Sequence, residues 1–290
     1  MLPGHKDSLR YMTHNFEHSW FTVNKLSNDL WSIDDIGFDL SYLITGSDRA
    51  LLIDTGLGIG NIRAIAEELT TLPLLVVNTH AHPDHAGGDD QFPEVHLHHD
   101  DARLLNVIFT RKIRENAYSR GKILMEKKKI ELRDIPEFDL ERWINAKPNT
   151  IIPVTHGDTF DLGNRKLEVF SMPGHTPGSV VIVDKEKGRI FGGDSIIQRH
   201  PVWLHLDESA PLHQYRNALE KLCDISTSFS AMYSSHMNEP IEPSLLTELL
   251  ETADSILSGT EKGKYFRTHA GEGLILRHKR AGIIYREDNL

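Results

Sequence analysis

The chain is poor in cysteine and in long hydrophobic runs. Cys223 is the single cysteine among 290 residues, so no disulfide can form within the chain. The segment that carries it, A-L-E-K-L-C, is typical of a helix face, and we expect a structural thiol rather than a nucleophile. No apolar run approaches the roughly 20 residues that a transmembrane helix needs, so we expect no membrane span.

The chain also lacks an excess of positive charge and an apolar N-terminal segment. Its formal net charge is -10, whereas proteins that bind nucleic-acid phosphates usually present a basic surface. We therefore expect no nucleic-acid partner. The first ten residues, M-L-P-G-H-K-D-S-L-R, do not resemble a secretory signal, so the expected location is cytoplasmic. The chain shows no repeat or low-complexity tract, and we expect a single domain over residues 1–290.

The most informative stretch runs from Leu74 to Gly88. Leu74–Val77 is a short apolar run with β-branched residues, which predicts a buried strand. Side chains that commonly bind metals follow it within six residues: His80, His82, Asp84 and His85. A polar loop is the alternative in a chain with 17 histidines. The spacing, the residue types and the position after a strand together favour a metal site.

The spacing of these residues predicts how they could converge. In extended backbone, residues two apart project to the same side, so His80 and His82 can meet at one point. Pro83 ends the strand, and Asp84 and His85 then turn onto the next element, where they can face a second point nearby.

The hydrophobic pattern of the whole chain indicates an α/β protein. Strands are predicted as a hairpin over 16–34, at 38–45, 50–54, 74–77, 95–98, 150–154, 166–171, 180–183, 189–191 and 229–234, and as a final pair within 273–285. Helices are predicted at 61–70, 211–224 and 245–257. The metal-type residues thus follow the second strand of a strand–helix–strand unit, where open α/β folds place ligand sites.

Residues 100–146 differ from the rest, since they are charged and have helical spacing. We expect a largely helical insertion there. Its basic run, Lys127–Lys129, is either a solvated face or part of an active-site lid.

Three further metal-type residues lie in predicted loops at strand ends. His175 lies in a loop bracketed by proline and glycine, Asp194 follows two glycines, and His236 comes after the strand at 229–234. Each alone would be ordinary in a turn or a core. Their repeated position at strand ends favours one shared site.

Taken in order, these motifs resemble those of the metallo-β-lactamase-fold hydrolases, and most of all the glyoxalase II-like branch. The motifs are Asp54-Thr55-Gly56, His80-Ala81-His82-Pro83-Asp84-His85, Pro173-Gly174-His175-Thr176-Pro177-Gly178, Gly193-Asp194 and Ser235-His236. The resemblance implies an αββα four-layer sandwich: two mixed sheets face to face, helices outside, and metals at one edge. The helical insertion would be an addition to it.

The resemblance also implies roles for these residues. His80, His82 and His175 would hold one divalent metal ion, Asp84, His85 and His236 would hold a second, and Asp194 would bridge the two. Asp84 would in addition be essential for turnover. Asp54 would orient a ligand or the motif loop, with a helix-capping aspartate as the alternative.

The donor set suits Zn²⁺, with iron or manganese as alternatives. Coordination lowers the pKa of water from about 15.7 toward 7, so hydroxide is available at cellular pH. The implied activity is a binuclear metal-dependent hydrolase in which metal-bound hydroxide attacks a small ester, thioester or lactone. An iron-dependent redox enzyme on the same fold, of the persulfide dioxygenase or oxygen reductase type, and a phosphodiesterase of the RNase Z kind are the alternatives.

The expected partner is a small-molecule substrate, and dimers among similar proteins make a homodimer the expected assembly. Glyoxalase II binds glutathione with basic residues of a C-terminal helical region, for which Lys262, Lys264 and Arg267 are the possible counterparts. Similar acyl-homoserine lactonases carry a tyrosine soon after the bridging aspartate, where this chain has Ser195-Ile196-Ile197. Four residues beyond it line a substrate pocket or belong to an ordinary loop: Arg199, His200, Trp203 and His205.

Overall fold

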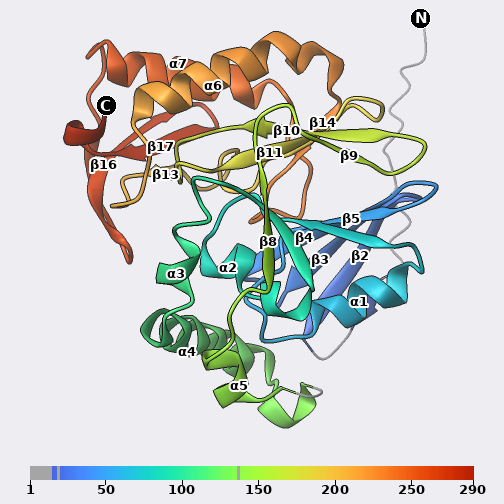
Figure 1. Cartoon of the computed structure of the whole chain (residues 1–290). Helices are drawn as coiled ribbons and strands as arrows, with labels where there is room; N and C mark the ends of the chain where they lie inside the picture. Colours follow the sequence, from blue (N-terminus) through green and yellow to red (C-terminus); the bar gives the residue numbers. More distant parts are fainter. Residues whose placement is uncertain (1–14, 18–19, 136–137) are drawn as a thin grey trace, which may run out of the picture.

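Two β-sheets lie face to face at the centre of the molecule, with helices on both outer sides (Figure 1). The structure is a computed structural model that describes residues 15–17, 20–135 and 138–290. Within these ranges the first sheet has eight strands in chain order: β1 (Asn15–Glu17), β2 (Phe21–Ser27), β3 (Leu30–Asp35), β4 (Asp39–Thr45), β5 (Ala50–Ile53), β6 (Leu74–Val77), β7 (Glu94–His98) and β8 (Thr150–Val154). The second has five, in the order β14 (Ala231–Tyr233), β12 (Arg189–Phe191), β11 (Val180–Asp184), β10 (Lys166–Ser171) and β9 (Thr159–Asp161). The N-terminal segment 1–10 discussed above, residues 18–19 of the predicted hairpin and residues 136–137 of the predicted insertion lie outside the described residues.

Strand direction brings several strand ends to one edge. β1 to β5 pair antiparallel, whereas β5 to β8 pair parallel. The helix α1 (Ile62–Leu69) makes the crossover from β5 to β6, and the Asn61 side chain caps it by accepting from the Ala64 N–H. In the second sheet β12 and β14 are parallel, connected through α6 (Leu212–Ile225). The loops that follow β5, β6, β10, β12 and β14 carry the predicted site residues.

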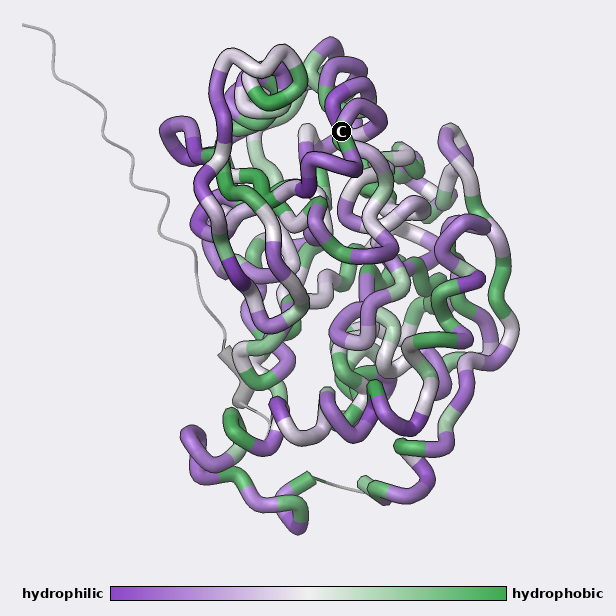
Figure 2. Tube along the Cα trace, turned by 90° about the vertical axis from the view of Figure 1, so that its left-hand side faces the viewer, coloured by the Kyte–Doolittle hydropathy of each residue, from purple (hydrophilic) through white to green (hydrophobic). Residues whose placement is uncertain are grey.

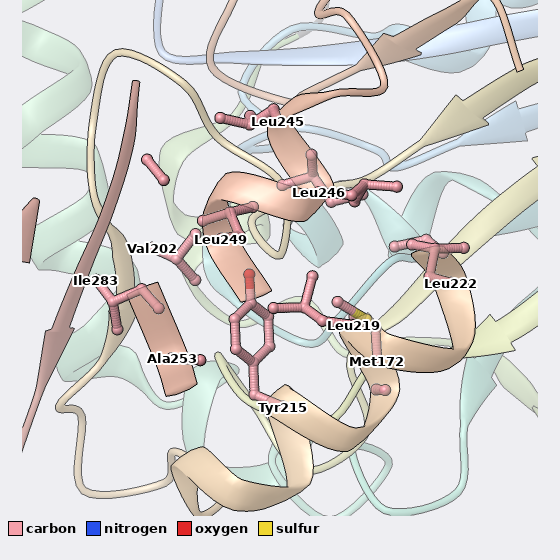
Figure 3. Close-up of a cluster of buried hydrophobic side chains, with 14 of the residues drawn as sticks. Met172, Val202, Tyr215, Leu219, Leu222, Leu245, Leu246, Leu249, Ala253 and Ile283 are labelled. Atoms are coloured by element: carbon pink, nitrogen blue, oxygen red, sulfur yellow. The ribbon is translucent and has the colours of Figure 1, made fainter. Parts of the chain in front are cut away.

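Apolar residues of the two sheets meet in the centre of the sandwich. This central core contains Leu40, Tyr42 and Ile44 of β4 together with Val169, Ile182 and Phe191 of the facing sheet. The outer face of the first sheet packs against α1, α4 (Arg111–Lys128) and α5 (Leu140–Ile144). The outer face of the second sheet packs against α6 and α7 (Leu245–Leu257) (Figure 3). The predicted αββα four-layer sandwich is therefore confirmed.

A third sheet lies beside the second one, at the left of Figure 1. Its order is β13 (Val202–Leu204), β17 (Ala281–Tyr285), β16 (Gly271–His278) and β15 (Lys264–Thr268). The sequence predicted only a final strand pair here and did not assign residues 202–204 to a strand. β13 has three residues and pairs with β17 about 80 positions later. Such a short strand shows no alternating hydrophobic pattern from which it could be predicted. β9, which also has three residues, was not among the predicted strands either.

The predicted insertion is helical. It contains α3 (Leu105–Ile108), α4 and α5, and Figure 2 shows its mainly hydrophilic character, broken by short hydrophobic stretches, at the bottom of the view. The buried residues of α4 recur at intervals of three and four: Arg114, Ala117, Gly121 and Met125. The lysines of the run Lys127–Lys129 are exposed, as expected for a solvated face.

The short helix α2 (Pro83–Ala86) is the turn onto which Asp84 and His85 were predicted to move. None of the helices among the described residues is both long and apolar enough to cross a bilayer. Cys223 lies on α6, half-buried against the outer core, as expected for a structural thiol.

Candidate metal centre

Three imidazoles from two loops turn ring nitrogens toward one point. His80 Nε2 lies 3.0 Å from His82 Nδ1, which in turn lies 2.8 Å from His175 Nε2. Burial lowers the pKa of His80 well below its usual value and that of His175 to about 4. Both rings are therefore neutral at pH 7. Ring nitrogens that face one another at this distance form a typical cation-binding arrangement.

The outward nitrogen of each of these rings is held by the protein. His82 Nε2 donates to Glu208 Oε1 at 2.8 Å, and His175 Nδ1 donates to the Trp203 carbonyl at 2.9 Å. His80 Nδ1 lies 3.1 Å from the Thr79 hydroxyl, which itself donates to Asp54. Such partners fix the tautomer and direct the remaining lone pair inward.

A second group lies directly beside the first. The ligand atoms of Asp39, His85 and His236 are all within 4.8 Å of one another. His85 Nδ1 donates to Asp54 at 2.9 Å, and His236 Nδ1 donates to the Phe38 carbonyl at 3.0 Å. Their Nε2 atoms are thereby left to face the site.

Asp194 lies between the two groups. One carboxylate oxygen is 3.1 Å from His236 Nε2 and 3.5 Å from His85 Nε2, and the other is 3.4 Å from His175 Nε2. Burial alone would raise the pKa of Asp194, but His236 and His85 hold it well below its usual value. Burial conversely would lower the pKa of His236, but the Asp194 carboxylate raises it to about 10. The carboxylate thus attracts positive charge to this position.

Buried atoms without partners test whether cations fit here. His85 Nε2, Asp194 Oδ1 and both carboxylate oxygens of Asp39 are buried and have no hydrogen-bond partner among the described residues. Buried polar atoms rarely lack partners, because their removal from water costs free energy that only a hydrogen bond or a bound ion offsets. Imidazole nitrogens and carboxylate oxygens together suit divalent cations, so the residues present fit them.

The structure brings the seven predicted ligands to one rim. Six of them make the close contacts described above: His80, His82, His85, His175, Asp194 and His236. Asp84 lies slightly apart, with a carboxylate oxygen 4.0 Å from His85 Nε2 and 21% of its side chain exposed. Burial would raise its pKa, but His85 and His236 lower it below the usual value, so Asp84 is ionised.

Asp54 contacts the motif loop as well as a histidine. It is fully buried, accepts from the Thr79 N–H at 2.7 Å and pairs with His85. Its φ of 63° is unusual for a residue other than glycine. The contacts are those of a positioning residue; the helix that follows is capped by Asn61 instead.

Sequence reasoning missed three residues of the site. Asp39 stands in an apolar run, F-D-L-S-Y-L-I, where a lone acid in a strand was its one signal. Glu208 meets His82 from 126 positions away, and no local pattern marks it. Asp101 accepts from the Ala81 N–H at 2.8 Å and from the Gly178 N–H at 2.7 Å, so it ties two ligand loops together.

A cavity of about 1650 Å³ opens above these residues. His82, Asp84, His175, Asp194 and His236 lie at its floor. Apolar side chains of the insertion line it from one side: Leu104, Val107, Ile113, Ile123 and Leu124. Basic and aromatic side chains contribute elsewhere: Arg120, His200, Trp203, Arg267, His269 and Arg277.

The cavity settles several predictions about individual residues. His200 and Trp203 line it, whereas Arg199 pairs with Glu239 at 3.1 Å and His205 contacts the Thr268 hydroxyl at 3.0 Å. The C-terminal region that carries the three predicted basic residues is a β-sheet rather than helical. Among those residues Arg267 lines the cavity, while Lys262 pairs with Glu287 on the surface and Lys264 is exposed on β15.

Several known proteins are similar to this chain in sequence, and a solved structure is similar to it in fold. Acyl-coenzyme A thioesterase MBLAC2 of Homo sapiens is 29% identical over 195 residues, which cover 61% of this chain and 67% of that protein. Hydroxyacylglutathione hydrolase GloC of Haemophilus influenzae is 25% identical over 150 residues, covering 52% of this chain and 62% of that protein. A solved metallo-beta-lactamase from Pontibacter korlensis superposes with a TM-score of 0.56 at 20% identity, covering 81% of this chain and 99% of that one. This last likeness concerns the fold alone.

The sequence profile of the Metallo-beta-lactamase superfamily matches residues 35–222, the part that contains six of the seven predicted ligands. The chain therefore belongs to the metallo-beta-lactamase superfamily, and it is a metal-dependent hydrolase.

Proposed function

We propose that the chain hydrolyses acyl thioesters whose acyl part is a long apolar chain and whose carrier is anionic. The observation that carries the proposal is the position of the inward-facing donors at the floor of a large cavity with apolar and basic linings. The thioester preference is supported by the relatives, a coenzyme A thioesterase and a hydroxyacylglutathione hydrolase.

In this proposal the seven predicted ligands hold two divalent cations. His80, His82 and His175 bind one, Asp84, His85 and His236 bind the other, and Asp194 reaches both. Zinc is our first assignment, with iron or manganese as alternatives. Such cations supply a hydroxide nucleophile at neutral pH and polarise a carbonyl oxygen.

The chain itself orients the ligands and the nucleophile. Glu208, Asp54 and the carbonyls of Phe38 and Trp203 hold the outward ring nitrogens, so the imidazoles cannot turn away. Asp84 is ionised and faces the cavity, where it can bind a cation or accept a proton from the attacking water.

The insertion provides a surface for the acyl chain. Val107 is 57% exposed and Ile123 is 54% exposed, and both line the cavity. Clustered apolar side chains left in water commonly mark a binding surface. The cavity volume of about 1650 Å³ also exceeds the roughly 300–1,000 Å³ of typical small-ligand pockets, which favours a long substrate over a small ester or lactone.

The arginines provide a surface for the carrier. Arg120, Arg267 and Arg277 reach the cavity from α4, β15 and β16. Guanidinium groups pair well with phosphates and carboxylates. Coenzyme A carries phosphates, whereas glutathione carries carboxylates. The experiment must therefore separate the effect of acyl length from the effect of the carrier.

The test is a substrate panel with measured metal content. The panel contains palmitoyl-coenzyme A, acetyl-coenzyme A, a hydroxyacylglutathione and bis-p-nitrophenyl phosphate. We expect bound divalent metal, highest kcat/KM with palmitoyl-coenzyme A, and loss of activity on chelation. A preference for the phosphodiester, or oxygen uptake by an iron-loaded protein, would replace the proposal with one of the alternatives, and a preference for the glutathione thioester would reassign the carrier.

A pair of variants makes the same test specific. Asp84→Asn should abolish thioester hydrolysis while its unfolding remains cooperative. Asp100→Asn, a carboxylate 42% exposed in a neighbouring loop, is the matched control and should keep its activity. Full activity of Asp84→Asn would contradict the role of Asp84.

A further inference from the structure

Asp39 lies at the metal centre but is not one of the seven predicted ligands. It is 2% exposed, and neither of its carboxylate oxygens has a hydrogen-bond partner among the described residues. One oxygen lies 3.9 Å from His85 Nε2, and Asp39 groups with His85 and His236 within 4.8 Å. The side chain is therefore directed at the second group of ligands.

The backbone on both sides of Asp39 holds it against the loop that carries His236. The Phe38 carbonyl accepts from His236 Nδ1 at 3.0 Å, and the Leu40 N–H donates to the Ser235 carbonyl at 2.7 Å. Alternation along β4 sends Leu40 and its equivalents into the central core, so Asp39 projects from the opposite face. The position is set by strand geometry rather than by a mobile loop.

Hydrogen bonds among the described residues account for neither oxygen, and the contact with His85 Nε2 is long, at 3.9 Å. A neighbouring buried acid, Asp35, accepts from the Leu57 N–H at 2.7 Å and from the Trp20 indole, so it stabilises the fold through hydrogen bonds. Asp39 has no such bonds. Buried carboxylates that lack hydrogen bonds are normally paired with a charge or bound to a metal.

The charge count agrees with a ligand. With Asp84 and Asp194, Asp39 makes three carboxyl groups within 4.0 Å of His85 Nε2, at a site that fits two dications. Three carboxylates and one hydroxide balance four positive charges. The second position would then have three carboxylate donors and two imidazoles, whereas the first has three imidazoles and Asp194.

We propose that Asp39 is an additional carboxylate ligand of the cation bound by Asp84, His85 and His236, and that it makes this position more favourable to Mn²⁺. Oxygen-rich donor sets suit Mn²⁺, whereas imidazole-rich sets suit Zn²⁺. The inference rests on the proposed pair of cations, and it concerns binding rather than turnover.

The test compares Asp39→Asn with the wild-type chain by metal binding. Metal-free protein is titrated with Mn²⁺, followed by electron paramagnetic resonance, and with Zn²⁺ against a chelator. We expect the first, tighter equivalent of Mn²⁺ to bind at least tenfold more weakly in Asp39→Asn, because it occupies the position that contains Asp39. The first equivalent of Zn²⁺, which occupies the imidazole-rich position, should be unchanged. The second equivalent of Zn²⁺ should weaken less than the first equivalent of Mn²⁺.

Ser41→Ala is the matched control, since Ser41 is two residues along β4, fully buried, and also has an unpartnered hydroxyl. It should bind both cations as the wild type does. Asp39→Ser serves as a second variant if Asp39→Asn does not fold. Unchanged Mn²⁺ affinity in the folded variant, or equal weakening of every equivalent, would overturn the proposal. If the wild-type chain itself binds no cation, the proposed function is wrong as well. If the wild-type chain binds two cations and hydrolyses thioesters, a negative result with the Asp39 variants contradicts only the assignment of Asp39.

Discussion

Each of the five histidines at the site has one ring nitrogen directed inward and the other held by a named group. The holding groups differ in chemistry: two carboxylates, two backbone carbonyls and one hydroxyl. Backbone carbonyls are fixed by the fold, whereas the carboxylate of Glu208 can be altered without moving the chain. Glu208 is therefore where the contribution of an outer partner can be measured.

We expect Glu208→Gln to weaken the first zinc equivalent by about ten- to a hundredfold, the usual cost of losing an outer partner of a metal ligand. Glu208 accepts from His82 Nε2 at 2.8 Å, and this hydrogen bond lowers the pKa of the Glu208 carboxyl below its usual value. An amide in its place carries no charge and can present its NH₂ group to the ring. Zinc retention against a chelator is the measurement.

Asp207→Asn is the control for this experiment, because Asp207 is the adjacent residue and its side chain is 99% exposed. The two variants should differ clearly in zinc affinity. Equal affinities would show that His82 keeps its orientation without Glu208.

At the scale of elements, the sandwich supplies the metal ligands, whereas the helical insertion and the third sheet supply walls of the cavity. The helices of the insertion present apolar side chains to the cavity, and the third sheet presents Arg267 and Arg277. Both parts are anchored in the cores: Leu276 and Ile283 pack with α6 and α7, and Met125 of α4 packs with the outer core of the first sheet. Substrate choice can therefore change without disturbing the ligand loops.

We expect Ile123→Gln to raise the KM for palmitoyl-coenzyme A about tenfold, because full burial of such a side chain contributes roughly 1.5–3 kcal/mol. The kcat/KM for acetyl-coenzyme A should be unchanged, since a two-carbon acyl group would not reach α4. Steady-state kinetics over a series of acyl lengths is the measurement. Leu132→Gln is the control, as Leu132 is 40% exposed in the same insertion but away from the residues that line the cavity. An Ile123→Gln effect that does not depend on acyl length would exclude the proposed acyl surface.

At the scale of the whole molecule, buried acids outside the site couple stability to pH. Burial raises the pKa of Asp35 to about 7, despite the hydrogen bonds from the Leu57 N–H and the Trp20 indole. The folded state therefore binds this proton more tightly than the unfolded state does. The resulting stabilisation is complete below about pH 4 and is lost as the pH rises through 7.

We expect the free energy of unfolding of the wild type, relative to Asp35→Asn, to fall by a few kcal/mol between pH 5 and pH 8, since one pKa unit corresponds to about 1.4 kcal/mol. Urea unfolding of metal-free protein at both pH values is the measurement, and subtraction of the variant removes the contributions of the histidines. Asp161→Asn is the control, because the Gly163 N–H lowers the pKa of Asp161, so its titration lies below this range. A difference that is the same at pH 5 and pH 8 would show that Asp35 is ionised throughout.

Local patterns in the sequence were enough for the elements and for most of the ligands. The helices at 61–70, 211–224 and 245–257 differ from α1, α6 and α7 by at most one residue at each end, because the period of their apolar residues is a local property. His80, His82, Asp84 and His85 lie within six residues, so their convergence follows from backbone geometry. The order of the remaining motifs was sufficient to indicate the sandwich.

Only the tertiary structure decided which distant residues complete the site. Asp39 and His85 are 46 positions apart, Glu208 and His82 are 126 apart, and β13 pairs with β17 at a separation of about 80. Contacts of this kind depend on how sheets and loops pack, and neither a period of 2 nor a period of 3.6 carries that information. The same is true of the cavity, whose walls come from the insertion and the C-terminal strands, two segments that meet only because the sandwich holds them on one edge.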